Sequence, residues 1–125
     1  MKFFNIIKER KTIMDDKNLQ LILNDLIDKK ASDVVYIDVS EVNPLARFYI
    51  ICTATSNRHA LALAQNLKEL CYQNQITIHN VEGKSSSDWV LVDANDYIIH
   101  IFTQTARFHY GLEKLWSNLK IIKVE

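Results

Sequence analysis

The stretch WVLVDANDYIIHIF, residues 89–102, decides the fold that this sequence predicts. Two runs of β-forming residues, 89–92 and 97–102, flank the polar tetrapeptide 93–96, and this is the pattern of a β-hairpin. Asn95 is expected to adopt the left-handed backbone conformation of the turn, because asparagine tolerates positive φ better than most residues other than glycine. Both runs are apolar on both faces, so we predict strands inside a sheet that helices or a partner protein cover on each side.

The length and composition predict one soluble globular domain. A chain of 125 residues with 48% hydrophobic and 24% charged residues can bury one core and is too short for two domains. Fifteen basic residues balance fifteen acidic residues, so no net field favours nucleic acid or an anionic membrane, and a protein or a small molecule is the expected partner. Cys52 and Cys71 lack metal-binding or redox spacing, and we interpret them as buried thiols in a reducing compartment, the cytoplasm.

The first residues of the chain are interpreted separately from the domain. We interpret residues 1–13 as a disordered N-terminal extension that precedes a single domain of residues 14–125, with Met14 as an alternative start. The apolar patch FFNII is too short for a signal peptide or a membrane span. A transit peptide is the other alternative, although the extension has no serine and carries an acid.

Hydrophobic periodicity predicts the order helix, two strands, helix, three strands, helix. This order predicts a mixed α/β fold, with a sheet of about five strands flanked by helices. The predicted strands are residues 34–39, 48–54, 76–81 and the two of the hairpin. The predicted helices are residues 16–30, a helix from the cap Ser56 to about residue 72, and a last helix that begins near Thr103 or Thr105 with the apolar stripe Phe108, Leu112, Leu115, Trp116 and Leu119.

A phosphate-binding loop has little support in the sequence. Gly83, Lys84 and Ser85 resemble the end of such a loop, but Ile78 stands where the motif needs an earlier glycine, and a strand follows where the motif needs a helix. The chain has only two glycines, which cannot build a glycine-rich nucleotide cradle. We therefore predict that the protein has no nucleotide cofactor.

Catalytic groups are equally weakly indicated. Asp38, Asp93 and Asp96 could hold a magnesium ion for phosphoryl transfer, but a hairpin turn explains the last two better, since turns use aspartate for local hydrogen bonds. Ser56 and Cys52 are the candidate nucleophiles. A helix cap and a core position explain them, and no catalytic triad is indicated.

The histidines and one tryptophan are the remaining candidates. His100 is the only polar side chain of its strand, so it is either a recognition residue or a core histidine with satisfied hydrogen bonds. Trp89 follows Glu82 and Asp88, and a large aromatic residue beside acids is typical of a protein-binding hot spot, although core tryptophans are as common. We predict no metal site, because paired ligand spacing is lacking among the histidines, which are His59, His79, His100 and His109.

Three motifs in order give a family resemblance. CTATSNRH (residues 52–59), VEG (81–83) ahead of the hairpin, and ARFHYGLEKLW (106–116) resemble the ribosomal silencing factor family, also called Iojap-like. The resemblance extends from about Leu19 to Trp116 and covers most of the chain. It implies a fold similar to that of nucleotidyltransferases, in proteins that are not known as enzymes.

The resemblance implies a ribosome-binding factor. Family members bind the fourteenth protein of the large ribosomal subunit, block joining of the small subunit sterically, and lower translation when nutrients are scarce. Organellar relatives assist large-subunit assembly, and members often form homodimers. A neutral protein with a local acidic and aromatic face can dock on a basic ribosomal protein without recognising RNA. The alternatives are a large-subunit assembly factor and a nucleotidyltransferase-like enzyme.

The resemblance also implies a recognition surface on and around the hairpin. The chain departs from the family at three positions: Arg47 stands where an acid is usual, Ala54 replaces a common glycine, and Asn95 replaces a glycine in the turn. Asn95 meets the backbone requirement of that turn, whereas the reversed charge of Arg47 argues against the family's contact through its loop. The residues carried over by position are Glu82, Asp88, Trp89, Asp96, Tyr97 and His100.

Overall fold

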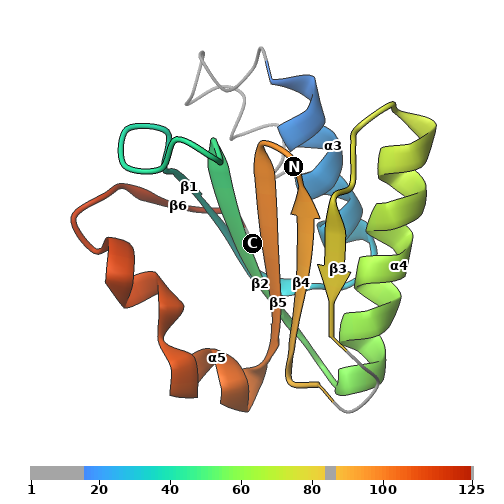
Figure 1. The fold of residues 1–125 in the computed structure, drawn as a ribbon. Coiled ribbons are helices and arrows are strands. Elements are labelled where there is room, and N and C mark those ends of the chain that lie inside the picture. The colour runs from blue at the N-terminus through green and yellow to red at the C-terminus, as the bar shows by residue number, and fades with distance from the viewer. Residues whose placement is uncertain (1–15, 84–86, 125) are drawn as a thin grey trace.

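The computed structural model describes residues 16–83 and 87–124. The interpretation of residues 1–13 as an extension and the Lys84 and Ser85 part of the phosphate-loop motif lie outside the described residues. Helices α3 and α4 lie together on one side of a twisted sheet, and α5 lies on the other side (Figure 1). The mixed α/β class that the sequence predicts is confirmed.

Across the described residues, six strands form one mixed sheet in the order β3-β4-β5-β2-β1-β6. The neighbours β2 and β5 are parallel, and every other neighbouring pair is antiparallel. The sixth strand was not predicted. The strands are β1 (Ser32–Asp38), β2 (Phe48–Ala54), β3 (Asn80–Glu82), β4 (Trp89–Ala94), β5 (Tyr97–Thr103) and β6 (Ile121–Lys123).

The predicted hairpin forms between β4 and β5. Trp89 pairs with Phe102 and Ala94 pairs with Tyr97, so the strands extend further into the polar tetrapeptide than predicted. The turn itself is the pair Asn95 and Asp96. Asn95 has a φ of 66°, as the sequence predicts, because a two-residue hairpin turn needs left-handed backbone angles that match the twist of the strands.

Two capped helices cover one face of the sheet. The carboxylate of Asp16 accepts a hydrogen bond of 2.9 Å from the backbone N–H of Leu19 at the start of α3 (Lys17–Asp28). The hydroxyl of Ser56 accepts one of 3.0 Å from the N–H of His59 at the start of α4 (Asn57–Gln73). Both helices bury a single apolar stripe, as predicted, and these stripes pack on the alternate side chains of the strands. In residues 16–83 and 87–124, no helix has both the length and the apolar content of a membrane span.

The C-terminal segment is not the single helix that the sequence predicts. Helix α5 (Gln104–Tyr110) ends at Gly111, which has the left-handed φ of 54° that is common after the last turn of a helix. A short 3-10 helix, η1 (Leu112–Trp116), follows, and the chain then adds β6 beside β1. The predicted stripe is therefore divided, and Phe108 and Leu115 are exposed rather than buried.

Strand β3 is also shorter than predicted. It begins at Asn80 rather than at residue 76 and pairs only with β4, at the edge of the sheet. Ile76 is buried with the core residues under α4, but it makes no ladder pairing in the described residues. The alternating apolar residues Ile76 and Ile78 are the reason that the sequence predicts a strand here. In the structure these two side chains belong to a connecting segment and pack into the core on the helix side of the sheet.

Candidate protein-binding face

The second face of the sheet is covered over only part of its width. Helix α5 packs over β5 and β2, and α5 and η1 close a small core on β1, β2 and β5 that includes Val35, Ile51 and Phe102. Along β4 the side chains alternate between half-exposed positions on this face and buried positions on the helix side. The predicted cover on both sides is therefore incomplete. We call the less covered part the open face; its half-buried residues are Tyr49, Trp89, Leu91, Asp93 and Ile98, and His100 is buried among them on the same face.

Two hollows lie on the open face. The first, which we call the Trp89 hollow, has a volume of about 510 Å³ and extends from Trp89 to Tyr110. The second, the His100 hollow, has a volume of about 590 Å³ and extends from His100 toward Asn43. Glu82 and Leu91 line both hollows, so the two are neighbours along β4. The open face is thus a shallow, continuous depression rather than an enclosed substrate pocket.

Trp89 is held rigidly at one end of this depression. Its indole Nε1–H donates a hydrogen bond of 3.1 Å to Nδ1 of His100. Its ring centroid lies 4.9 Å from that of Phe102 and 4.8 Å from that of Tyr110. A half-exposed tryptophan that is fixed in this way loses little side-chain entropy on binding, which is a property of interface anchors.

His100 is buried beneath the open face. Only 5% of the residue is exposed, and burial lowers its pKa to about 4, so the ring is neutral at pH 7. The ring centroid lies 5.3 Å from that of Tyr49, which is on the neighbouring strand β2 and the same face of the sheet. One ring nitrogen accepts the hydrogen bond from Trp89, so His100 agrees in part with its interpretation as a core histidine with satisfied hydrogen bonds. The same hydrogen bond links the buried histidine to the half-exposed tryptophan.

Acid is expected to destabilise the fold through His100. The unfolded chain binds the imidazole proton near the usual pKa of about 6.5, whereas the folded chain binds it only near pH 4. The stabilisation from the neutral ring is therefore complete above pH 6.5 and is lost as the pH falls toward 4. We expect the free energy of unfolding to fall by roughly 2 to 3 kcal/mol across this window in urea titrations. The ionisable neighbours in the hollow are His79, Glu82 and Asp93, so His100→Gln is the control; an equal fall in that variant would assign the effect to other groups.

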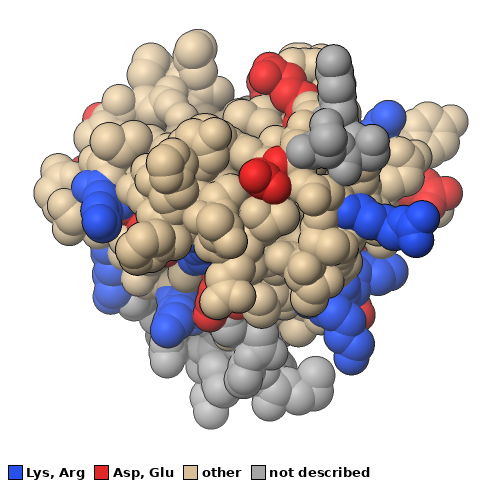
Figure 2. Space-filling model, turned by 90° about the horizontal axis from the view of Figure 1, so that it is seen from below, with Lys and Arg blue, Asp and Glu red and all other residues tan. Residues whose placement is uncertain are grey.

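Acidic side chains border the depression. Glu82 and Asp88 are exposed beside Trp89, and Asp93 lies in the His100 hollow. Among the described residues that line the two hollows there is no lysine or arginine. Viewed from the end of the molecule at which α5 lies, the surface is mainly uncharged at its centre with isolated acidic groups, and Lys and Arg side chains stand toward its sides (Figure 2). The structure thus places aromatic and acidic groups together, which the sequence suggests around Trp89.

Only four of the six carried-over residues lie together. Glu82, Asp88, Trp89 and His100 surround the depression, but Tyr97 is 6% exposed and lies on the helix side of the sheet. Neighbouring strand positions point to opposite faces, so Tyr97 and His100, three residues apart, cannot share one. Asp96 is exposed in the turn, at the end of the hairpin opposite Trp89. Tyr97 is therefore not part of the open face, whereas Asp96 lies beside Asn95, which lines the His100 hollow.

Tyr97 connects the hairpin to helix α3. Its hydroxyl donates a hydrogen bond of 2.6 Å to the capping carboxylate of Asp16. Burial and this hydrogen bond raise the pKa of Tyr97 well above its usual range. Arg47 reaches the same carboxylate at 3.3 Å and lies 5.0 Å from the centroid of the Phe48 ring. The arginine that departs from the family pattern therefore supports the start of α3.

Removing the Tyr97 hydroxyl is expected to weaken the fold. Tyr97→Phe leaves the buried Asp16 carboxylate without one donor, and hydrogen bonds to charged groups contribute about 1.5 to 3 kcal/mol. Urea unfolding should show a loss in this range. Tyr49→Phe is the matched control, because the Tyr49 hydroxyl accepts a hydrogen bond of 3.1 Å from the neutral amide of Asn43, and its loss should cost less, about 1 kcal/mol. Equal losses in the two variants would contradict a charge-assisted bond at Tyr97.

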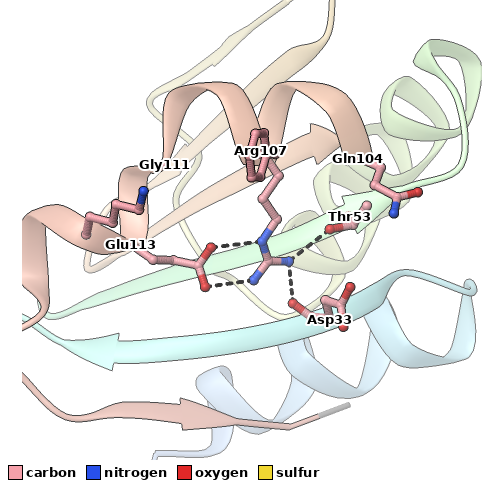
Figure 3. A pocket seen from close by; sticks show the side chains of 8 residues that line it. Asp33, Thr53, Gln104, Arg107, Gly111 and Glu113 are labelled. Atoms are coloured by element: carbon pink, nitrogen blue, oxygen red, sulfur yellow. Dashed lines mark hydrogen bonds and ion pairs between the residues drawn. The ribbon is translucent and has the colours of Figure 1, made fainter.

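A residue that sequence reasoning did not single out, Arg107, organises the covered part of this face. Its guanidinium makes two parallel hydrogen bonds to the carboxylate of Glu113, of 2.9 and 3.0 Å, and donates to the Thr53 hydroxyl at 2.9 Å and to the carbonyl of Asp33 (Figure 3). It lines a pocket of about 330 Å³. Because these four hydrogen bonds use four of its five N–H donors, Arg107 joins α5 and η1 to β1 and β2. In the sequence, only the presence of Arg107 within the ARFHYGLEKLW motif indicates that this residue has a role.

The other candidate reactive groups have structural explanations. Burial raises the pKa of Cys52 to about 12 and that of Cys71 to about 11, so both free thiols are protonated at neutral pH, in agreement with their interpretation as core residues. Gly83 allows a close approach of the chain to β4, since a Cβ there would lie 2.9 Å from Cγ2 of Val90. In the part of the chain that the structure describes, no cluster of three His, Cys, Asp or Glu residues could hold a metal ion.

Comparisons with known proteins agree with this geometry. Residues 13–125 match the family model described as ribosomal silencing factor during starvation. The chain is 36% identical over 107 residues to the ribosomal silencing factor RsfS of Halalkalibacterium halodurans, covering 86% of this chain and 92% of that protein. It is 28% identical to a mouse protein named mitochondrial assembly of ribosomal large subunit protein 1, over 80% of this chain and 45% of the mouse protein.

Solved structures give the same result. A crystal structure from Bacillus halodurans, 34% identical in sequence, superposes with a TM-score of 0.74 over 88% of this chain and 98% of that one. An X-ray structure of a Chromobacterium violaceum protein, 33% identical, superposes with a TM-score of 0.77 over 81% of this chain and 84% of that one. With a family model that matches nearly the whole chain, and with relatives above 30% identity, this chain belongs to the ribosomal silencing factor family.

Proposed function

We propose that this protein is a ribosomal silencing factor that binds the large ribosomal subunit in the cytoplasm and prevents the small subunit from joining, under nutrient limitation. The observation that carries the proposal is the open face, where the fixed ring of Trp89 stands beside acidic side chains on a chain of this family. A bound protein in the path of the small subunit is sufficient for steric occlusion. The proposed role therefore needs no catalytic residue.

The proposed partner is the fourteenth protein of the large subunit, as the family resemblance implies. Aromatic residues are enriched at the centres of protein interfaces, and Trp89 is already held in one position before binding. The acidic rim formed by Glu82 and Asp88 complements a basic protein and repels phosphate groups. We therefore propose direct protein recognition, with no recognition of nucleic acid.

Co-sedimentation with isolated ribosomal subunits tests this function. The purified protein is expected to pellet with large subunits and not with small subunits. Adding it to a subunit-joining assay in sucrose gradients should reduce the amount of joined ribosomes. Pelleting with neither subunit, or with both equally, would contradict the proposal.

A role in assembly of the large subunit is the second candidate, and the name of the mouse relative favours it. The two roles differ in the phenotype of a deletion strain. Immature large subunits that accumulate during rapid growth, without a defect in starvation, would support the assembly role. Translation that stays high in starved cells would support silencing.

We propose that the protein is not a nucleotidyltransferase-like enzyme. Asp38 and Asp93 lie on opposite faces of the sheet. The neighbours of Asp38 in the chain, Ile37 and Val39, point to the side of the open face, so Asp38 points to the helix side, whereas Asp93 is on the open face. Each makes a local hydrogen bond, to the backbone N–H of Ser40 at 3.0 Å and to that of Asn95 at 3.3 Å, respectively. Calorimetry with magnesium and nucleoside triphosphates should show no heat of binding.

A homodimer is the other assembly that the resemblance implies. Phe108 and Leu115 are 89% and 69% exposed at the end of the molecule where α5 lies, and they offer apolar area to a second copy. Analytical ultracentrifugation of the free protein measures the assembly directly. A sedimentation coefficient of a monomer across the micromolar range would contradict it.

A further inference from the structure

The proton position on His100 follows from its hydrogen bond to Trp89. An indole nitrogen can only donate, so Nδ1 of His100, which lies 3.1 Å from Nε1 of Trp89, must be the acceptor. The neutral ring, which the lowered pKa of about 4 favours at pH 7, therefore carries its proton on Nε2. The second ring nitrogen is a hydrogen-bond donor.

This donor has no partner within the described residues. Nε2 of His100 is buried and makes no hydrogen bond to residues 16–83 or 87–124. A buried donor without an acceptor costs stability, and more than nine in ten buried polar groups of folded proteins have a partner. His100 is 5% exposed and lines a hollow of about 590 Å³, so there is space beside this unpaired donor for an acceptor from another molecule.

The surroundings of the His100 hollow define the chemistry of that acceptor. Glu82 and Asp93 line the hollow, and no lysine or arginine is among its described lining residues, so a carboxylate or phosphate would be repelled. An uncharged oxygen, such as a backbone carbonyl or a hydroxyl, meets no repulsion. The rest of a segment that enters the hollow would contact Leu91 and Ile98, which are apolar, and an acidic rim that favours basic side chains.

We propose that the His100 hollow receives an uncharged oxygen acceptor from a basic segment of the partner protein, which accepts a hydrogen bond from Nε2–H of His100. This inference rests on the proposed function, because the segment belongs to the protein that docks on the open face. The nitrogen is buried in the free protein, so the half-buried side chains of Tyr49 and Leu91 at the hollow shift when the segment enters. His100 then contributes in two ways, by holding Trp89 and by a direct bond.

Two substitutions separate these contributions. In His100→Asn the amide oxygen takes the place of Nδ1 and can still accept from Trp89, but the side chain does not reach the position of Nε2. In His100→Gln the amide nitrogen lies near the position of Nε2 and can still donate, but the acceptor for Trp89 is lost. We expect His100→Asn to bind isolated large subunits about tenfold more weakly than the wild type, and His100→Gln to bind more tightly than His100→Asn.

The outcomes distinguish the inference from the function on which it rests. If wild-type protein does not pellet with large subunits, the proposed function fails. If the wild type binds and His100→Asn binds equally well or better than His100→Gln, the function stands and the direct bond is refuted. Thermal unfolding of each variant verifies folding. Should either variant unfold, Leu91→Phe narrows the hollow without changing His100, and unchanged binding by that variant would also refute the inference.

Discussion

Trp89→Ala is expected to weaken binding to the large ribosomal subunit by roughly 30-fold or more, because it removes the fixed aromatic anchor of the open face. Truncation of an interface tryptophan that is held in place commonly costs 2 kcal/mol or more, which corresponds to about this factor. The ring contacts to Phe102 and Tyr110 disappear with the indole, and Nδ1 of His100 loses its donor. Co-sedimentation at a series of subunit concentrations measures the change.

Two further variants control for general damage to the protein. Trp89→Phe keeps a ring against Phe102 and Tyr110 but lacks the indole N–H, so we expect an intermediate affinity. Tyr72→Ala removes an aromatic side chain that is 84% exposed on α4, on the other side of the sheet, and should bind as the wild type does. Wild-type binding by folded Trp89→Ala, or an equal loss in Tyr72→Ala, would show that the open face is not the docking surface.

Arg107→Ala is expected to lower the free energy of unfolding by roughly 2 to 4 kcal/mol, because one side chain provides the polar contacts of α5 with three other segments. The substitution removes the bidentate pair of hydrogen bonds to the Glu113 carboxylate. It also removes the hydrogen bonds that Arg107 donates to the Asp33 carbonyl and the Thr53 hydroxyl. The Arg107 side chain is only 13% exposed, so solvent cannot replace these bonds fully. Urea unfolding measures the loss.

A more exposed ion pair provides the comparison for Arg107. Lys29 and Asp25 approach to 3.2 Å at the end of α3, with side chains that are 46% and 11% exposed, so Lys29→Ala should lower stability by less than about 1 kcal/mol. Arg107→Lys keeps the charge but cannot make two parallel bonds to Glu113, and we expect it to recover only part of the loss. A full recovery by lysine would mean that charge alone, and not the planar geometry, holds α5 in place.

The elements that local sequence predicts correctly have local causes. Ser56 caps its helix as predicted, through a hydrogen bond to the residue three positions later, and Asn95 meets the backbone requirement of a two-residue turn. The C-terminal helix was predicted too long because its apolar spacing continues past Gly111. A glycine commonly follows the last turn of a helix, so Gly111 in the sequence marks the end of the helix even though the apolar spacing continues beyond it.

Part of the candidate site was also accessible from the sequence. The grouping of Glu82, Asp88 and Trp89 follows from their closeness to one strand and its edge, and the position of His100 opposite β4 follows from the hairpin register. Strand alternation alone would have separated Tyr97 from His100. Arg107 could not be found in this way, because its partner Asp33 is 74 residues distant and its other strand partner, Thr53, is 54 residues distant.

Local pattern was sufficient for the class of the fold, its hairpin and its capped helices, because these depend on backbone preferences and on the spacing of apolar residues along short segments. Tertiary packing decided which half of the second sheet face α5 leaves open, and which of the apolar residues therefore face a partner. It also decided that burial keeps His100 neutral with its Nε2–H unpaired among the described residues. These features depend on contacts between residues far apart in the chain, and no local pattern contains them.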